Sequence, residues 1–324
     1  MAPVAERSAS LSARGRHPIV IGVSWMVASA AGYAFFTVFA QVALRSLRPV
    51  DVLFWRFVIA APVAWLLVAF RSQLRSRPVA GGPALPSIGL GLLFGVLAWL
   101  AFAALEHLTG ALYVVIIYTY PAMVAIGGRL LGRPAPARIA IPIVVMMIGI
   151  VLTAPEVFDG SRDGVLLGAA MTVGNAALYA GYILWSERLL HRGEGVAVDG
   201  LVVAAWGLTG SLVTAVTFSL CAGGPRLPDD GGTVAALVGL ALVSTVLAGA
   251  GFLLGVRHIG AARAALLATL EPVLALVLLV TLRGERLGVL QGLGAALVLA
   301  SVVWSQRLGP GRPGSPVAVG RRRR

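Results

Sequence analysis

The stretch that decides the fold is residues 264–286, AALLATLEPVLALVLLVTLRGER. It is an almost wholly apolar run, long enough to cross a bilayer, with Glu271 and Pro272 near its middle. Because every backbone polar group in lipid must be satisfied within the protein, we expect Pro272 to mark a kink that protein or a cavity covers. A carboxylate at that depth costs about 2.5–3.5 kcal/mol to insert, so Glu271 is a candidate functional residue facing the bundle interior. The alternative is a glutamate paired with an arginine of a neighbouring helix for assembly alone.

Composition indicates a polytopic membrane protein. Of the 324 residues, 58% are hydrophobic and 12% charged, with a mean hydropathy of +0.91. A soluble protein carries about twice as much charge. The net charge of +13 lies in loops and in the tail at 321–324, which suits membrane topology and anionic lipid, so no nucleic-acid partner is expected. The single cysteine, Cys221, excludes an internal disulfide framework, and we expect neither a metal site nor a cofactor.

Windows of about 20 apolar residues predict ten membrane spans. They lie near residues 19–44, 51–70, 87–105, 110–131, 138–154, 164–186, 198–221, 233–256, 261–282 and 287–306. The flanking stretches 1–17 and 307–324 are expected to be polar tails. No soluble domain fits between the spans.

Arginine distribution predicts the orientation of the chain. If the N-terminus is inside, nineteen of the 26 basic residues fall in inner segments and six in outer loops, with Arg56 left within a span. Positive residues favour the cytoplasmic side. We therefore expect an inner-membrane protein with both termini in the cytoplasm.

The chain also repeats itself. A shift of 151 residues places His107 on His258 and Pro121 on Pro272, and a shift of 146 places Tyr33 on Tyr179. Each half, 18–156 and 161–306, would contain five spans, and an odd number makes the halves enter the membrane from opposite sides. The prediction is an all-α membrane protein of ten helices, built as two inverted five-helix repeats around a central cavity.

The second half carries a family resemblance. It reads Leu-Ala-Thr-Leu-Glu-Pro-Val at 267–273, Arg-Gly-Glu-Arg-Leu at 283–287 and Gln-Gly at 291–292. Over about 22–306 the chain resembles the ten-helix EamA-type carriers of the drug/metabolite transporter superfamily, in which a mid-helix proline precedes a Gly-Glu-Arg turn. The resemblance implies a carrier of small molecules, and many such carriers export amino acids or other metabolites. The first half departs from the pattern, because Arg133 stands where the family usually has a glutamate.

Polar residues at helical spacing are the candidate substrate-binding groups. Tyr120 is the first-half equivalent of Glu271 under the shift of 151, and an acid and a phenol would face each other across the cavity. Two polar stripes run along otherwise apolar spans and should face protein or water. The first contains Asn175, Tyr179, Tyr182 and Ser186, and the second contains Tyr33, Thr37 and Gln41. Helix packing with satisfied hydrogen bonds is the alternative for these side chains.

Arg56 is the basic residue that lies within a span, next to Trp55. Three interpretations stay open from the sequence. Arg56 binds a substrate carboxylate, it pairs with Glu271, or it extends to the outer interface together with Trp55.

These patterns favour a secondary transporter of small organic metabolites. We expect it to export amino acids or related solutes and to be driven by an ion or solute gradient. An enzyme is not expected, because no nucleophile with a base and no pair of close carboxylates is evident. The alternative is a lipid-handling, flippase-like protein or a structural membrane protein. Glu271 would either carry a coupling proton or bind a substrate amine.

Overall fold

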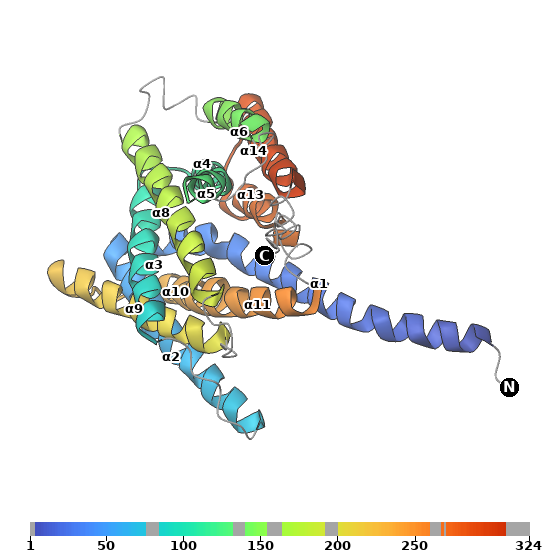
Figure 1. Cartoon of the computed structure of the whole chain (residues 1–324). Coiled ribbons are helices and arrows are strands. Elements are labelled where there is room, and N and C mark those ends of the chain that lie inside the picture. The colour runs from blue at the N-terminus through green and yellow to red at the C-terminus, as the bar shows by residue number, and fades with distance from the viewer. Residues whose placement is uncertain are drawn as a thin grey trace, which may run out of the picture.

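The computed structural model describes residues 4–75, 84–131, 140–153, 164–191, 200–259, 267–268 and 270–308. Within these ranges every regular element is a helix, as the composition predicts (Figure 1). The helices are α1 (Val4–Ala43), α2 (Pro49–Arg75), α3 (Ala84–Leu105), α4 (Gly110–Ile117), α5 (Tyr120–Leu130), α6 (Ala140–Thr153), α8 (Val165–His191), α9 (Gly200–Cys221), α10 (Gly231–Ala241), the π-helix η2 (Leu242–Leu247), α11 (Ala248–Ile259), α13 (Leu270–Arg283) and α14 (Val289–Leu308).

Seven helical runs in the described part are long and apolar enough to cross a membrane. They are Ile19–Ala43, Pro49–Gln73, Ala84–Leu105, Gly110–Leu130, Val165–Ser186, Gly200–Cys221 and Gly231–Phe252. The other three predicted spans coincide with α6 and α13, of 14 residues each, and with α14, whose apolar run covers Val289–Ser301. The chain is therefore a multi-pass, all-helical membrane protein, and ten spans stay a prediction.

The start of the chain is more regular than the sequence suggests. Residues up to His17 were expected to form a polar tail, yet α1 is helical from Val4 onward, and only its part from Ile19 is apolar enough to enter a membrane. Figure 1 shows this first part of α1 extending away from the other helices.

The first helix of each half of the chain packs against helices of the other half. Helix α1 packs along α10, η2, α11 and α13 of the second half, and α8 packs along α3, α4 and α5 of the first half. If α1 and α8 are equivalent spans, these contacts are reciprocal. Two related halves would make contacts of this kind, although the inverted arrangement itself stays a prediction. Helices α6 and α14, the last of each half, lie against each other (Figure 1).

Small residues allow the closest helix crossing, between α3 and α9. A Cβ atom on Gly91 would collide with the carbonyl of Gly207, so the two backbones touch there. Ser211 Oγ donates to the Gly91 carbonyl at 2.9 Å, and Thr214 Oγ1 donates to the Leu92 carbonyl at 3.1 Å. Glycine contacts with bonded hydroxyls are a usual way to join helices in lipid, where apolar surface gives no preference for protein over lipid tails.

A salt bridge joins the turn after α1 to the loop before α10 at one end of the bundle. Arg48, in the turn between α1 and α2, bonds Asp51 and donates to the carbonyls of Ala222 and Gly224 at 2.9 Å each. Asp51 in turn accepts from the Arg226 backbone at 3.0 Å. The end of α1 is thereby fixed to the loop between α9 and α10, which is the end where the pocket described below lies.

Candidate functional site

Glu271 lies in the first turn of the described helix α13, followed by Pro272. Residues 260–266 and 269 lie outside the described part of the chain, so the kink expected at Pro272 stays a prediction.

The break between α4 and α5 brings two tyrosines to Glu271. Helix α4 ends at Ile117 with Tyr118 as its C-terminal cap, and α5 starts at Tyr120 with Pro121 in its first turn. The helix is thus interrupted where the sequence predicts a kink. Tyr118 is a hydrogen-bond partner of the Glu271 carboxyl.

Five tyrosines share the region of Glu271, and we call them the tyrosine group. Their hydroxyls all interact electrostatically with the Glu271 carboxyl. The members are Tyr33, Tyr113, Tyr118, Tyr120 and Tyr179. The Tyr120 and Tyr179 rings meet edge to face with centroids 4.8 Å apart, and Tyr118 lies 5.9 Å from Tyr120. Since these residues come from α1, α4, α5 and α8, the group forms where both halves of the chain meet.

Asn175 belongs to the same region. Its Nδ2 donates to the Tyr113 hydroxyl at 3.1 Å, and the side chain is only 2% exposed. Its Oδ1 has no hydrogen-bond partner within the described residues. A buried carbonyl oxygen without a donor is costly, so this atom is a free acceptor for a donor group on a bound molecule or a water.

Arg56 is enclosed by aromatic rings. It is 4% exposed, and its Cζ lies between 5.1 and 5.8 Å from the ring centroids of four phenylalanines. These rings belong to Phe36, Phe57, Phe94 and Phe102. The interpretation that Arg56 extends to the interface is therefore wrong for this conformation. Trp55, its neighbour, does reach the end of the bundle, where Nε1 donates to the Arg226 carbonyl at 2.9 Å.

Arg56 donates from Nε to Thr245 Oγ1 at 2.9 Å instead of pairing with Glu271. Among the described side chains, Arg48 and Asp51 form a salt bridge. Thr245 lies in the π-helix η2, and its hydroxyl donates to the Leu240 carbonyl five residues earlier at 2.8 Å. π-Turns of this kind often occur at functional sites.

The candidate site keeps its acidic side chain, Glu271, apart from its basic side chain, Arg56. Tyr33 and Tyr113 interact electrostatically with both Glu271 and Arg56, so these two phenols link the surroundings of the acidic and the basic side chain. A hydroxyl both donates and accepts, and it can therefore adapt to a carboxylate, a carboxylic acid or a bound amine. No group of three His, Cys, Asp or Glu side chains suited to a metal ion occurs among the described residues.

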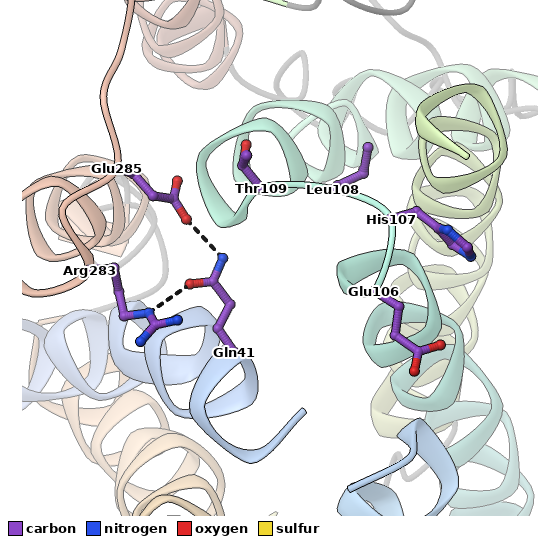
Figure 2. A pocket seen from close by; sticks show the side chains of 7 residues that line it. All are labelled: Gln41, Glu106, His107, Leu108, Thr109, Arg283 and Glu285. Carbon is purple, nitrogen blue, oxygen red and sulfur yellow. Dashed lines mark hydrogen bonds between the residues drawn. The ribbon is translucent and has the colours of Figure 1, made fainter. Parts of the chain in front are cut away.

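A pocket of about 340 Å³ lies between the last turn of α1, the turn before α4 and the end of α13. Figure 2 shows its seven lining residues, with Arg283 and Glu285 on one side and Glu106 and His107 on the other. Burial raises the pKa of the Glu106 carboxyl, and the neighbouring His107 acts in the opposite direction.

Glu285 holds the start of α4. Its Oε1 accepts from Gln41 Nε2 at 2.8 Å and from the Gly110 amide at 3.0 Å, while Oε2 accepts from the Ala111 amide at 2.9 Å. Arg283 Nε donates to Gln41 Oε1 at 3.0 Å, which completes the chain of bonds in Figure 2. Thr109, also in the pocket lining, caps α4 by accepting from the Leu112 amide.

The structure thus gathers all six residues that the sequence singles out for substrate binding into one connected region. These are Glu271, Tyr120, Asn175, Tyr179, Tyr33 and Arg56. Sequence reasoning missed Tyr118, because a continuous helix would turn it away from Tyr120. It also missed Thr245 and the four phenylalanines, and the aromatic residues at 36, 57, 94 and 102 offered no pattern beyond ordinary apolar packing.

Comparisons with known proteins agree on the kind of molecule. The model of the EamA-like transporter family matches residues 20–154 and again residues 166–306. The uncharacterized transporter YcbK of Bacillus subtilis is 25% identical over 256 residues, covering 76% of this chain and 80% of that protein. The uncharacterized transporter sll1319 of Synechocystis is 25% identical over 244 residues, covering 74% of this chain and 70% of that protein.

A solved structure supports the fold alone. It is described as a crystal structure of a protein, superposes with a TM-score of 0.60 at 18% identity, and covers 91% of this chain and 99% of its own. The family model, by contrast, matches most of the sequence in two successive copies. The chain therefore belongs to the EamA-like transporter family and is a membrane transporter.

Proposed function

We propose that this transporter is a secondary active carrier that exports small organic solutes, amino acids or related molecules, driven by an ion or solute gradient. Glu271 and the tyrosine group form its substrate site, with Tyr33, Tyr120, Tyr179, Asn175 and Arg56 as contacts. The carrier lies in the inner membrane as ten helices in two inverted repeats, with both termini in the cytoplasm.

The observation that carries this proposal is the setting of Glu271. Its carboxyl interacts electrostatically with tyrosines from both halves, and no salt bridge joins it to an arginine among the described residues. A carboxylate within a membrane span that lacks a permanent counter-charge favours neutralisation by a proton or by a cationic ligand. Either event ties the state of Glu271 to a solute or ion that moves, which is the requirement for coupled transport.

Export from proteoliposomes tests the proposal. Vesicles containing the purified protein are loaded with labelled amino acids, and efflux is followed with and without a pH gradient. We expect efflux above that of empty liposomes, and we expect Glu271→Gln to abolish its dependence on the gradient. Asp230→Asn is the matched control, because Asp230 caps α10 outside the site. Equal, gradient-independent efflux in the wild type and in the Glu271→Gln variant would contradict the assignment of Glu271.

Reporter fusions test the proposed orientation. Reporters after Arg324 and in the described loop before Gly231 are expected to give opposite signals, since positive residues are concentrated on the side of the termini. Equal signals at the two positions would reject it.

A further inference from the structure

The contacts of Glu285 join helices that are far apart in the sequence. Gln41 ends α1, Gly110 and Ala111 begin α4, and Glu285 follows α13. The carboxylate thus satisfies two free amides of a helix start, where negative charge is also favoured by the helix dipole. Hydrogen bonds with one charged partner are the stronger kind, so these contacts hold the three helix ends together.

The fit depends on Gly110. A Cβ atom at this position would lie 2.9 Å from Gln41 Nε2 and 3.1 Å from Glu285 Oε1. Both distances are too short for an ordinary contact, so a Cβ atom here would displace the ends of the Gln41 and Glu285 side chains and weaken the approach of the carboxylate to the α4 amides. The same Cβ would lie 2.7 Å from Leu279 Cδ2, which shows how tightly α13 packs under the α4 start.

Two helix faces lead from these contacts back to the candidate site. On α13, Leu279, Ala275 and Glu271 follow one another at steps of four and share one face. Leu279 and Ala275 are buried. On α1, Gln41 and Tyr33 are separated by two such steps, with the buried Thr37 between them, whose hydroxyl has no partner within the described residues. The Glu285 contacts therefore close the end of a stretch that begins at the tyrosine group.

The turn that matches this one in the first half has the opposite charge. The sequence there reads Leu131, Gly132, Arg133, and Arg133 stands in the place that Glu285 takes after Gly284. An arginine has no acceptor atom for backbone amides. The sequence therefore does not repeat the Glu285 carboxylate in the turn after the first-half proline helix.

We propose that Glu285 is a latch at the outer end of the carrier. While its carboxylate is bonded to Gly110, Ala111 and Gln41, the stretch between Ala275 and the pocket at Glu106 is closed. Release of a solute to that side requires the carboxylate to leave the α4 amides, which separates α13 from α4. The latch rests on the proposed transport function, but its closing contact can be tested without transport.

Thiol accessibility is the test. In a Cys221→Ser background, which removes the chain's single, exposed cysteine, Ala275→Cys introduces a probe below the latch. A membrane-impermeant maleimide is added to intact cells or to inverted vesicles, so each side is sampled separately. We expect Glu285→Ala to increase the labelling rate from the outer side by at least about tenfold, because a charged hydrogen-bond partner is worth about that factor or more. Labelling from the inner side should not change.

Asp230→Asn is the matched control, because this substitution also removes a carboxylate from a helix start. The Asp230 carboxylate bonds Thr233 of its own helix and joins no other helix end in the described part of the chain. The substitution should leave the labelling rate unchanged. Glu285→Gln, which keeps the size of the side chain, should lie between the parent and Glu285→Ala. An unchanged outer rate in Glu285→Ala, or an increase only from the inner side, would overturn the latch. If labelling responds as expected while no solute is transported, the proposed function fails and the latch stands.

Discussion

One glutamate lies within helix α13 and another follows its end, and their surroundings differ in kind. Glu285, after its end, accepts three bonds, two of them from backbone amides whose positions are fixed by the start of α4. Glu271, in its first turn, meets side-chain hydroxyls that can rotate and can either donate or accept. Fixed donors stabilise one charge state in one conformation, whereas hydroxyls tolerate several. The contrast is what we expect if Glu285 stabilises a closed conformation and Glu271 binds the transported species, as proposed above.

The strongest test of this contrast is Glu271→Gln. We expect coupled efflux to fall at least about tenfold, because a hydrogen bond to a charged group is worth about 1.5–3 kcal/mol. The melting temperature of the purified protein should stay close to that of the wild type, since glutamine keeps the size and the acceptor oxygen. A large loss of stability with unchanged efflux would return Glu271 to a purely structural role.

For Glu285→Ala we expect the opposite result, a loss of stability that is larger than the loss of coupled efflux. Loss of the acceptor leaves the Gly110 and Ala111 amides without their partner, at a cost of about 1–3 kcal/mol in unfolding free energy. Denaturation in detergent measures this cost. If Glu285→Ala is as stable as the wild type, the carboxylate contributes nothing to the closed end.

Gly110→Ala disturbs the same contact from the other helix. The added methyl group would push against Gln41, Leu279 and Glu285, and overpacking of this kind costs about 1–3 kcal/mol. In the Glu285→Ala background the cost should be smaller, because one of the clashing groups is gone. A double-mutant cycle that shows simple additivity would contradict the close approach described for Gly110.

Tyr118→Phe probes the surroundings of Glu271 with a smaller change. It removes one hydroxyl partner and leaves the aromatic packing with Tyr120, so we expect a loss of about 0.5–1.5 kcal/mol, which is severalfold in efflux rate. Tyr182→Phe is the matched control, because the Tyr182 ring stacks on Tyr179 while the hydrogen bond to Glu271 comes from Tyr118. Equal effects of both variants would show that the hydroxyl of Tyr118 has no special role.

Asp230 supplies a third carboxylate and the smallest expected effect. The side-chain hydrogen bond from Thr233 lowers the pKa of Asp230, and the Thr233 amide acts in the same direction. A carboxyl whose pKa is lower in the folded state adds stability above its unfolded pKa and loses it as the pH falls through the folded value. The wild type should therefore exceed Asp230→Asn slightly in melting temperature at neutral pH, and the difference should vanish in acid. A difference that grows on acidification would be the wrong sign.

Apolar windows predicted the helical class, which the structure confirms. Spacing within a helix selected Tyr33, Tyr179 and Asn175, whose role in binding stays a prediction. Sequence reasoning failed where an interruption changes the geometry: the break before Tyr120 rotates Tyr118 toward Glu271, and the π-turn at Thr245 leaves no periodic trace. The role of Glu285 could not be predicted either, because its partners on α4 are backbone amides, which every sequence contains.

The packing of each half's first helix against the other half has a consequence for biogenesis. Helix α1 leaves the ribosome first, yet the helices it packs along, α10 to α13, are made near the end of synthesis. Until then the face of α1 around Ser29, which donates to the Ala248 carbonyl at 2.7 Å in the finished protein, lacks these partners. Neither half can complete its own interior during translation. Assembly of the bundle is therefore a late, whole-chain event, and a truncation after the first half would leave α1 inserted but without its partners.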